Sequence, residues 1–508
     1  MSEKFYYITT PIYYVNDKPH IGHAYTTLAS DVLARFMRLD GYQVKFLTGT
    51  DEHGQKVEQA AKTAGMAPQD FVDKVSQNFR ALGDILKFSN NDFIRTTEER
   101  HKKSATALWN KLVEKGDIYL GKYAGWYAVR DETFYLETDL KDGKAPTGAD
   151  VEWVEEPSYF FRLSKWQDKL LAFYEEHPDF IAPTSRRNEV ISFVKSGLRD
   201  LSVSRTSFKW GIPVPNDPDH IMYVWIEALS NYITAVGYPD ELSDTFQKFW
   251  PCDLHMVGKD IVKFHAVYWP AFLMAAGLQP PKRIFAHGWW TNEGQKISKS
   301  LGNVIDPINL VETYGLDPVR YFLLREVPFG SDGDFSKTAI IQRLNSNLAN
   351  DLGNLIQRTA SMAYKNCEGM IPHFQEFTQE DLDLLYEASN ALKSLRSLLQ
   401  EQLFHKALDV LWTIIGNANR YIDHQAPWSL KKTDTQRMGT VLYVVLEVTR
   451  HLGLYLQAFM PDSATKILDL LGVPEDQRTF AYGGCDFSLK AGTQLQEPTP
   501  IFPRYVEN

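Results

Sequence analysis

Two short segments, at residues 19–23 and 296–300, constrain the fold of this 508-residue chain more than any other feature. The first, Pro19-His20-Ile21-Gly22-His23, follows an apolar run at residues 5–14. It precedes a stretch in which Leu28, Val32 and Phe36 recur every fourth residue. This pattern predicts a strand, a tight loop and a helix. The N–H groups and the dipole at such a helix start favour a bound anion.

The second segment, Lys296-Ile297-Ser298-Lys299-Ser300, lies in a Gly-containing loop at residues 292–302. Its ammonium groups suit charge that develops on a polyphosphate during a reaction. Alone, the first segment is also compatible with a turn that holds a core histidine, and the second with a solvated loop. Their order, each beside a predicted strand, favours a nucleotide site built from both halves of the chain.

The two segments are the HIGH and KMSKS patterns of class I aminoacyl-tRNA synthetases, with Ile297 at the Met position. Five further segments narrow the resemblance: Thr10-Pro11-Ile12-Tyr13-Tyr14-Val15-Asn16, Gly49-Thr50-Asp51-Glu52-His53-Gly54, Tyr223-Val224-Trp225-Ile226-Glu227-Ala228, Gly258-Lys259-Asp260-Ile261-Val262-Lys263-Phe264-His265 and His287-Gly288-Trp289. Taken together, they resemble the methionyl-specific family of these enzymes, from about Phe5 to at least Trp428.

Periodicity and resemblance predict an α/β Rossmann-type parallel-sheet catalytic domain, split by a connective insertion and followed by a C-terminal α-helical bundle. The expected ranges are 1–115 for the first half of the catalytic domain, 116–221 for the insertion, 222–295 for the second half, 296–340 for the KMSKS loop and stem-contact region, and 341–508 for a helical anticodon-binding domain.

Three apolar faces support the helical bundle. They are Leu344, Leu348, Leu352 and Leu355; Leu382, Leu385, Leu392, Leu395 and Leu399; and Val441, Val445, Val448, Leu452 and Leu456. The Gly- and Pro-rich tail from Tyr482 is expected to pack back in extended form.

The resemblance implies activation of L-methionine with ATP to methionyl-adenylate, followed by transfer to the 3′ end of tRNA(Met). Positioning and charge stabilisation dominate such phosphorus chemistry. His20, His23, Lys296 and Lys299 are the implied catalytic residues, and magnesium arrives with ATP. The implied ATP-binding residues are His20, Gly22, His23, His287, Gly288, Trp289, Lys296, Ile297, Ser298 and Lys299.

A methionine pocket must grip a flexible, apolar thioether through aromatic and aliphatic contact. The predicted pocket residues are Ile12, Tyr14, Asp51, Trp225, Ala228, Leu229, Tyr232, Asp260, Phe264 and His265. The resemblance implies that Tyr232 and His265 lie near the sulfur and that Asp51 pairs with the ammonium. Two other interpretations stay open: a core stripe for Trp225, Leu229 and Tyr232, and helix N-caps for Asp51 and Asp260.

In the predicted helical domain, the resemblance implies that Asn354, Arg358 and Trp428 recognise the anticodon. Amide, guanidinium and indole groups suit unstacked bases. A generic helix surface with one buried tryptophan is the alternative.

Many members of the family hold zinc with Cys-x-x-Cys knuckles in the insertion. Residues 123–137 contain no cysteine, so we expect this segment to fold without structural zinc. The insertion is also shorter than the editing domains of the isoleucyl, valyl and leucyl relatives.

The net charge of −10 does not itself indicate a nucleic-acid partner. Three isolated cysteines, no run of about 18 apolar residues and no leader predict a cytoplasmic protein without a membrane span. We expect a monomer. The rival interpretations are a class I synthetase for cysteine or a branched aliphatic amino acid, and a catalytically inactive RNA-binding paralogue.

Overall fold

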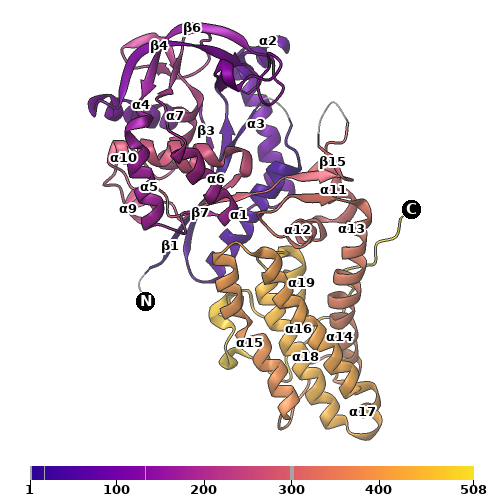
Figure 1. The fold of residues 1–508 in the computed structure, drawn as a ribbon. Helices are drawn as coiled ribbons and strands as arrows, with labels where there is room; N and C mark the ends of the chain where they lie inside the picture. Colours follow the sequence, from indigo (N-terminus) through magenta and orange to yellow (C-terminus); the bar gives the residue numbers. More distant parts are fainter. Residues whose placement is uncertain (1–2, 16–17, 132, 298–301, 508) are drawn as a thin grey trace. The chain divides into compact units, whose positions relative to one another are not determined.

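The computed structural model describes residues 3–15, 18–131, 133–297 and 302–507 (Figure 1). The chain forms two compact units. The sheet unit contains residues 5–19 and 45–287, and the helical unit contains residues 1–4, 20–44 and 288–508. Each unit is therefore built from segments that are far apart in the sequence.

The sheet unit is organised around a six-stranded sheet of order β3-β2-β1-β12-β13-β7. β1 pairs in parallel with β12, with Ile8 opposite Leu254, and β12 pairs in parallel with β13. Tyr7 and Ile8 are fully buried, as expected for a parallel strand covered on both faces. The predicted parallel α/β sheet is confirmed. The strands are β1 (Phe5–Tyr14), β2 (Gln43–Asp51), β3 (Asp92–Arg95), β7 (Ile181–Ala182), β12 (Leu254–Gly258) and β13 (Ile284–His287).

The helices of this unit connect and cover the strands. They are α2 (Gln55–Thr63), α3 (Pro68–Ile85), α4 (Glu99–Glu114), α5 (Gln167–Glu176), α6 (Thr184–Lys195), α7 (Val224–Leu229), α8 (Asn231–Thr234), α9 (Asp244–Phe249) and α10 (Trp269–Ala276). α4 packs against α7, α8 and α10, so its apolar face closes one side of the core.

The range expected to be an insertion contains antiparallel strands. β4 pairs along its length with β6, and Tyr119 of β4 stacks on Phe160 of β6. The strands are β4 (Ile118–Ala128), β5 (Thr133–Tyr135), β6 (Glu152–Phe161), β8 (Leu201–Ser202), β9 (Ser204–Arg205), β10 (Pro213–Val214) and β11 (Asp217–Met222). β7 lies in the same range but pairs with β13, so this segment also supplies an edge strand of the main sheet.

The helical unit begins with α1 (Ile21–Leu39) and continues from residue 288. Its small sheet has the order β15-β14-β16. The elements are β14 (Trp290–Asn292), β15 (Gln295–Lys296), α11 (Pro307–Tyr314), α12 (Leu316–Arg325), β16 (Gly333–Phe335), α13 (Lys337–Arg343), a π-helical run Leu344–Gly353, α14 (Asn354–Asn366), α15 (Gln379–Gln400), α16 (Phe404–Gln425), α17 (Pro427–Thr433), α18 (Thr435–Leu456) and α19 (Pro461–Leu470). Figure 1 shows α14 to α18 side by side as a bundle.

Two arginines from the C-terminal half of the chain hold α1. Arg320 of α12 and Asp31 of α1 are both fully buried, and their charged atoms lie 2.7 Å apart. Arg320 also donates to the carbonyls of Ala458 and Phe459. Arg396 of α15 contacts Asp40, the C-cap residue of α1, at 2.5 Å.

Two of the three predicted helix faces are confirmed. Leu344, Leu348, Leu352 and Leu355 are buried, as are all five residues predicted on α18. The face predicted for α15 is wrong in part, because Leu382 is exposed. Its buried stripe is instead Asp381, Leu384, Ala388, Ala391, Leu395 and Leu399. Because Ala388 is small, the hydroxyl of Tyr455 on α18 can approach and donate to its carbonyl at 3.0 Å. The close approach of the two helices, and not the positions of the leucines, therefore decides which face of α15 is buried.

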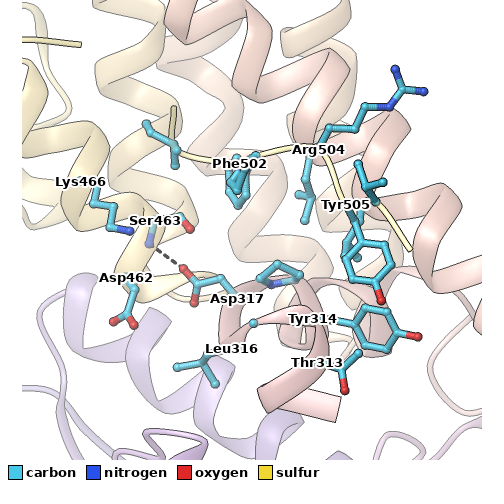
Figure 2. Close-up of a pocket in the computed structure, with 17 residues that line it drawn as sticks. Thr313, Tyr314, Leu316, Asp317, Asp462, Ser463, Lys466, Phe502, Arg504 and Tyr505 are labelled. Atoms are coloured by element: carbon cyan, nitrogen blue, oxygen red, sulfur yellow. Dashed lines mark hydrogen bonds between the residues drawn. The ribbon is translucent and has the colours of Figure 1, made fainter. Parts of the chain in front are cut away.

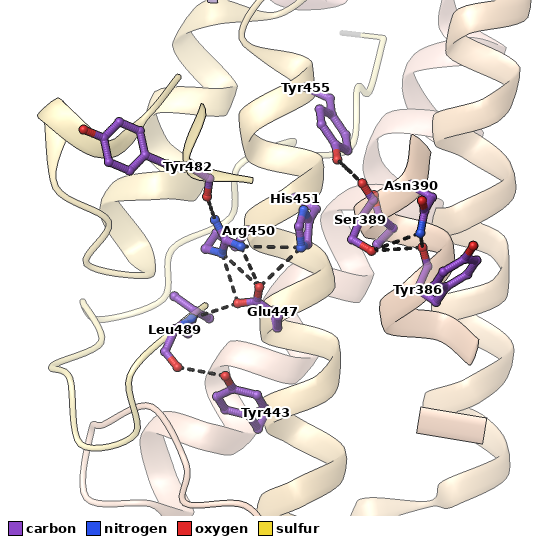
Figure 3. Close-up of polar contacts among 11 residues, drawn as sticks. Tyr386, Ser389, Asn390, Tyr443, Glu447, Arg450, His451, Tyr455, Tyr482 and Leu489 are labelled. Atoms are coloured by element: carbon purple, nitrogen blue, oxygen red, sulfur yellow. Dashed lines mark hydrogen bonds and ion pairs between the residues drawn. The ribbon is translucent and has the colours of Figure 1, made fainter. Parts of the chain in front are cut away.

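The tail packs back on the bundle as predicted, but it is not extended throughout, because Cys485–Phe487 form a 3₁₀ turn. Figure 3 shows the buried carboxylate of Glu447, on α18, accepting from Arg450 and from the backbone N–H of Leu489, with Nε2 of His451 3.3 Å away. Arg450 also donates to the carbonyl of Tyr482. The ion pair therefore satisfies backbone groups of the tail, as buried charges require. Among the described residues, no helix combines the length and the apolar character needed to cross a bilayer.

Candidate active site

His20 and His23 stand at the start of α1. Nδ1 of His20 accepts from the N–H of Gly22 at 3.0 Å, and the N–H of His20 donates to Nδ1 of His23 at 3.0 Å. A ring nitrogen that accepts carries no proton, so each neutral imidazole has its N–H at Nε2. Burial and the neighbouring His20 hold the pKa of His23 well below its ordinary value. Donors at a helix N-terminus suit an anionic phosphate.

Gly22 keeps this turn open. A Cβ on this residue would lie 2.9 Å from the His20 ring and displace it. Glycine at this position therefore has a local cause in the histidine cap. The ATP contact that the resemblance implies for Gly22 stays a prediction.

Hydrogen bonds hold the described residues at both ends of the loop at residues 292–302. Asn292 donates to the carbonyl of Asn303 at 2.9 Å, and Asn303 donates to the carbonyl of Lys296 at 3.1 Å. The N–H of Ile21 donates to the carbonyl of Ile305 at 3.2 Å. The start of α1 and the segment that follows the loop at residues 292–302 are thus joined by a backbone hydrogen bond, although they are far apart in the sequence. Lys296 is exposed and Ile297 is half-buried; Ser298 and Lys299 lie outside the described residues.

The segment His287-Gly288-Trp289 spans the unit boundary. His287 is buried at the end of β13 in the sheet unit. Gly288 and Trp289 belong to the helical unit, where the N–H of Trp289 donates to Asp332 at 2.8 Å. A side chain at Gly288 would overlap the backbone of Ser331. Nζ of Lys296 lies 5.9 Å from the centre of the exposed Trp289 ring.

The predicted methionine residues gather within the sheet unit. Trp225 of α7 stacks on Phe264 with ring centres 3.7 Å apart and an interplanar angle of 14°. Ala228, Leu229 and Tyr232 are buried beside them, and Ile12 packs against the same core. The core-stripe interpretation thus holds for Leu229 and Tyr232 by burial, whereas Trp225 is only partly buried.

Tyr232 and His265 form a polar pair within this apolar wall. The Tyr232 hydroxyl lies 2.7 Å from Nε2 of His265, and both residues are 1% exposed. Burial lowers the pKa of His265 to about 4, despite the opposing effects of the Ile261 carbonyl and Asp260. Burial also raises the pKa of Tyr232, and the charge of Asp51 contributes in the same direction.

The N-cap interpretations of Asp51 and Asp260 are wrong. Asp51 is the last residue of β2, and α2 has Gly54 as its N-cap. Asp260 lies inside the 3₁₀ turn Lys259–Ile261 and is exposed. Asp51 instead lies on a tight strand exit, where the N–H of Val15 donates to its carbonyl at 3.2 Å. Tyr14, the last residue of β1 and the neighbour of Val15, is half-buried.

A buried contact next to Asp51 was not predicted from the sequence. Nδ1 of His53 lies 2.5 Å from Oε1 of Glu227 on α7. Both residues belong to segments that carried the family resemblance, but the sequence assigns neither a role. The sequence did contain one indication of this contact: each residue belongs to a segment that also contains predicted site residues.

The predicted anticodon residues lie on helices of the bundle. Asn354 is exposed at the start of α14, and Trp428 of α17 is 48% exposed. The alternative of a buried tryptophan is therefore wrong. Arg358 donates to Asp423 at 2.7 Å and to Asn419 at 3.0 Å, both on α16.

The cysteine-free segment of the insertion is organised by Asp131. Its carboxylate accepts from Tyr135, Thr147 and Arg130. Burial raises the pKa of Tyr135 to about 12, with Asp131 acting in the same direction. Among the described residues, no cluster of three or more His, Cys, Asp or Glu side chains is arranged to hold a metal ion. The donors present do not fit a structural zinc, which needs about four thiolate or imidazole ligands.

A pocket of about 430 Å³ in the helical unit lies away from all predicted site residues. Figure 2 shows Asp317 of α12, Lys466 of α19 and Tyr314 and Tyr505 around it. Asp317 accepts from the backbone N–H of Ser463 at 2.6 Å, and so caps the start of α19. The pocket therefore lies between packed helices and the tail, and none of the predicted site residues lines it.

Comparisons with known proteins agree with this geometry. The family model "tRNA synthetases class I (M)" matches residues 6–149 and 136–360, and the model "Anticodon binding domain of methionyl tRNA ligase" matches residues 371–508. Methionine–tRNA ligases of Rickettsia bellii and Brucella suis are 60% and 56% identical, over 99% and 100% of this chain and 99% of each relative.

Solved structures give the same result. The Mycobacterium tuberculosis methionyl-tRNA synthetase in complex with methionyl-adenylate has a TM-score of 0.96 and is 53% identical, covering 99% of this chain and 100% of that one. The apo form of that enzyme has a TM-score of 0.91 at 49% identity, over 100% of this chain and 99% of that one. The chain is a member of the methionyl-tRNA synthetase family, the class I methionine–tRNA ligases.

Proposed function

We propose that this chain joins L-methionine to tRNA(Met) in two steps, with the residue roles given below. A methionine carboxylate oxygen attacks the α-phosphorus of ATP, the bond to the bridging oxygen breaks, and pyrophosphate leaves. The 3′-terminal hydroxyl of the tRNA then attacks the acyl carbon of the adenylate, and AMP leaves. The relative solved with methionyl-adenylate supports the first step.

The observation that carries the ATP assignment is the histidine pair at the start of α1. Its two accepting Nδ1 atoms set both Nε2–H groups as donors for phosphate. Gly22, His287, Gly288 and Trp289 complete the proposed nucleotide contacts.

Lys296, Ile297, Ser298 and Lys299 form the proposed loop over the pyrophosphate, with the lysine charges acting as negative charge moves to the leaving group. Magnesium would enter with ATP, whose phosphate oxygens are ligands of the kind it prefers.

The methionine assignment follows from the aromatic wall in the sheet unit. A thioether gains most from stacked rings and aliphatic groups, which Trp225, Phe264 and Leu229 supply. Asp51 would pair with the ammonium, and Tyr232 and His265 would lie near the sulfur. Ile12, Tyr14, Ala228 and Asp260 complete the proposed pocket.

Asn354, Arg358 and Trp428 would read the anticodon through base edges and stacking. The match of the anticodon-binding model to residues 371–508 supports a tRNA partner for this domain. We further propose a monomer that acts in the cytoplasm without structural zinc.

The direct test is ATP–pyrophosphate exchange with the purified chain, measured for each amino acid without tRNA. Methionine alone is expected to stimulate exchange, because adenylate formation needs no tRNA. Exchange stimulated by cysteine or leucine, and not by methionine, would reject the proposal.

A further inference from the structure

A deeply buried polar contact of the sheet unit lies beside the proposed ammonium site. Glu227 is 2% exposed and His53 is 5% exposed, and the 2.5 Å separation of their polar atoms is that of a strong hydrogen bond. An ionised carboxylate only accepts, so Nδ1 of His53 donates. The contact joins two segments that are 174 positions apart in the sequence.

A second imidazole, that of His101, lies near the same oxygen of Glu227 and serves as an internal comparison. Nε2 of His101 is 3.7 Å from Oε1 of Glu227, and neither of its ring nitrogens has a hydrogen-bond partner among the described residues. Burial lowers the pKa of His101 to about 3, so this ring is neutral near pH 7. Of these two described histidines, only His53 donates a hydrogen bond to the carboxylate.

The His53–Glu227 contact fixes one end of the segment that carries Asp51. At the other end, the N–H of Val15 donates to the carbonyl of Asp51. Between them, Glu52 is held by Arg95 at 2.7 Å and by Thr97 at 2.6 Å. Rotation of the Asp51 backbone is thus restricted on both sides.

Glu227 also belongs to the helix that carries the aromatic wall. It lies on α7 between Trp225 and Ala228. A hydrogen bond from His53 to Glu227 therefore sets the distance between Asp51 and α7. Removing one partner of a polar contact buried this deeply leaves the other without its hydrogen bond, which disturbs the local geometry.

We propose that His53 and Glu227 are positioning residues that hold Asp51 at a fixed place relative to the wall on α7, so that the ammonium and side chain of methionine are bound together. This inference rests on the proposed function. Neither residue contacts the substrate in this scheme; both act through Asp51.

The variants follow from the atoms involved. His53→Leu removes the donor. His53→Asn keeps an N–H donor near the position of Nδ1. His101→Leu makes the same apolar change in the buried imidazole that donates no hydrogen bond, and is the matched control. Glu227→Gln keeps the volume and an acceptor while removing the charge.

The readouts separate positioning from packing. In the exchange assay, His53→Leu is expected to raise the KM for methionine about tenfold, the effect of weakening one hydrogen bond to a charged group. The inhibition constant of L-methioninol, which keeps the ammonium, is expected to rise in parallel. The KM for ATP and the inhibition constant of methylthiobutanoate, which lacks the amino group, are expected to stay within about twofold.

His101→Leu and His53→Asn are expected to bind methionine nearly as the wild type does. In an Asp51→Asn background, His53→Leu is expected to add no further loss, because both changes remove the same interaction.

Additive losses in the double variant, or equal losses for methylthiobutanoate and methioninol, would overturn the inference. So would a KM for methionine in His101→Leu that matched His53→Leu. If His53→Leu does not fold, Glu227→Gln carries the test, and an unchanged KM for methionine in that variant would also overturn it. A wild type without methionine-dependent exchange would instead reject the proposed function.

Discussion

Tyr232 donates its hydroxyl proton to His265. Nδ1 of His265 lies 2.9 Å from the carbonyl of Ile261, and a carbonyl only accepts, so Nδ1 carries the ring proton. Nε2 is then the acceptor for the Tyr232 hydroxyl at 2.7 Å. The Tyr232 hydroxyl therefore gives its O–H to His265, and only its lone pairs are left for a further hydrogen bond within the apolar wall.

Tyr232→Phe leaves Nε2 of His265 buried without its donor. The apparent free energy of unfolding is expected to fall by about 1–3 kcal/mol, measured by urea denaturation. Tyr238→Phe is the control, because Tyr238 is buried but its hydroxyl makes no hydrogen bond to another described residue. Equal losses for the two variants would mean that the Tyr232–His265 contact contributes nothing measurable.

Acid should destabilise the fold through His265. Its folded pKa of about 4 lies below the ordinary value of about 6.5, so protons bind to the unfolded chain first as pH falls. This contribution is fully present above pH 6.5 and is lost progressively as pH falls to about 4. Urea midpoints at pH 7, 6 and 5 are expected to fall less steeply for His265→Gln. Identical pH slopes would show that His265 has no such role.

The Asp31–Arg320 pair is expected to be a major stability determinant of the helical unit. Asp31→Asn leaves a buried guanidinium without its counter-charge, which typically costs about 3–5 kcal/mol. Asp40→Asn makes the same change at the end of the same helix, where Arg396 is half-exposed, and is expected to cost below about 1 kcal/mol. Chemical denaturation that gave the same loss for both would contradict this ranking.

Trp428→Ala is expected to lower aminoacylation of tRNA while leaving ATP–pyrophosphate exchange near wild type. Stacking of one base on an aromatic ring contributes about 1–3 kcal/mol, which is about 5- to 150-fold in the tRNA-dependent step. Tyr386→Ala, on α15, removes an even more exposed aromatic side chain from the same bundle and is the control. A parallel fall in both reactions would make Trp428 a structural residue.

The purified protein is expected to contain no stoichiometric zinc and to keep exchange activity after chelation once magnesium is restored. The hydrogen bonds of Asp131 are expected to stabilise this segment in place of a bound metal. Asp131→Ala should therefore raise the rate of amide hydrogen exchange across residues 131–149. Elemental analysis that found one zinc per chain would reject this account.

Sequence patterns predicted the elements well where apolar side chains had to be buried. The strand at residues 5–14 is an apolar run buried on both faces, and the helix after His20 buries the predicted Leu28, Val32 and Phe36. On α15 the same reasoning failed, since Leu382 is exposed and Ala388 is buried. Residue type alone does not reveal where two helices approach most closely.

The site was predictable residue by residue but not contact by contact. The segment containing Asp51 was identified, yet its N-cap interpretation failed because α2 begins only after Gly54. The hydrogen bond from His53 to Glu227 depends on α7 lying beside the end of β2. No local pattern encodes that relation, because both residues become neighbours only through the tertiary fold.

The buried partner of Asp31 has a consequence for the order in which the chain is made. Arg320 lies 289 positions after Asp31, so a growing chain completes α1 long before this buried partner exists. Until α12 emerges, Asp31 can pair with the partly exposed Arg35 of its own helix, but α1 cannot settle into its final buried environment. The histidine helix, although synthesised among the first elements, is therefore expected to be among the later ones to reach its native packing, since closing so long a loop is slow.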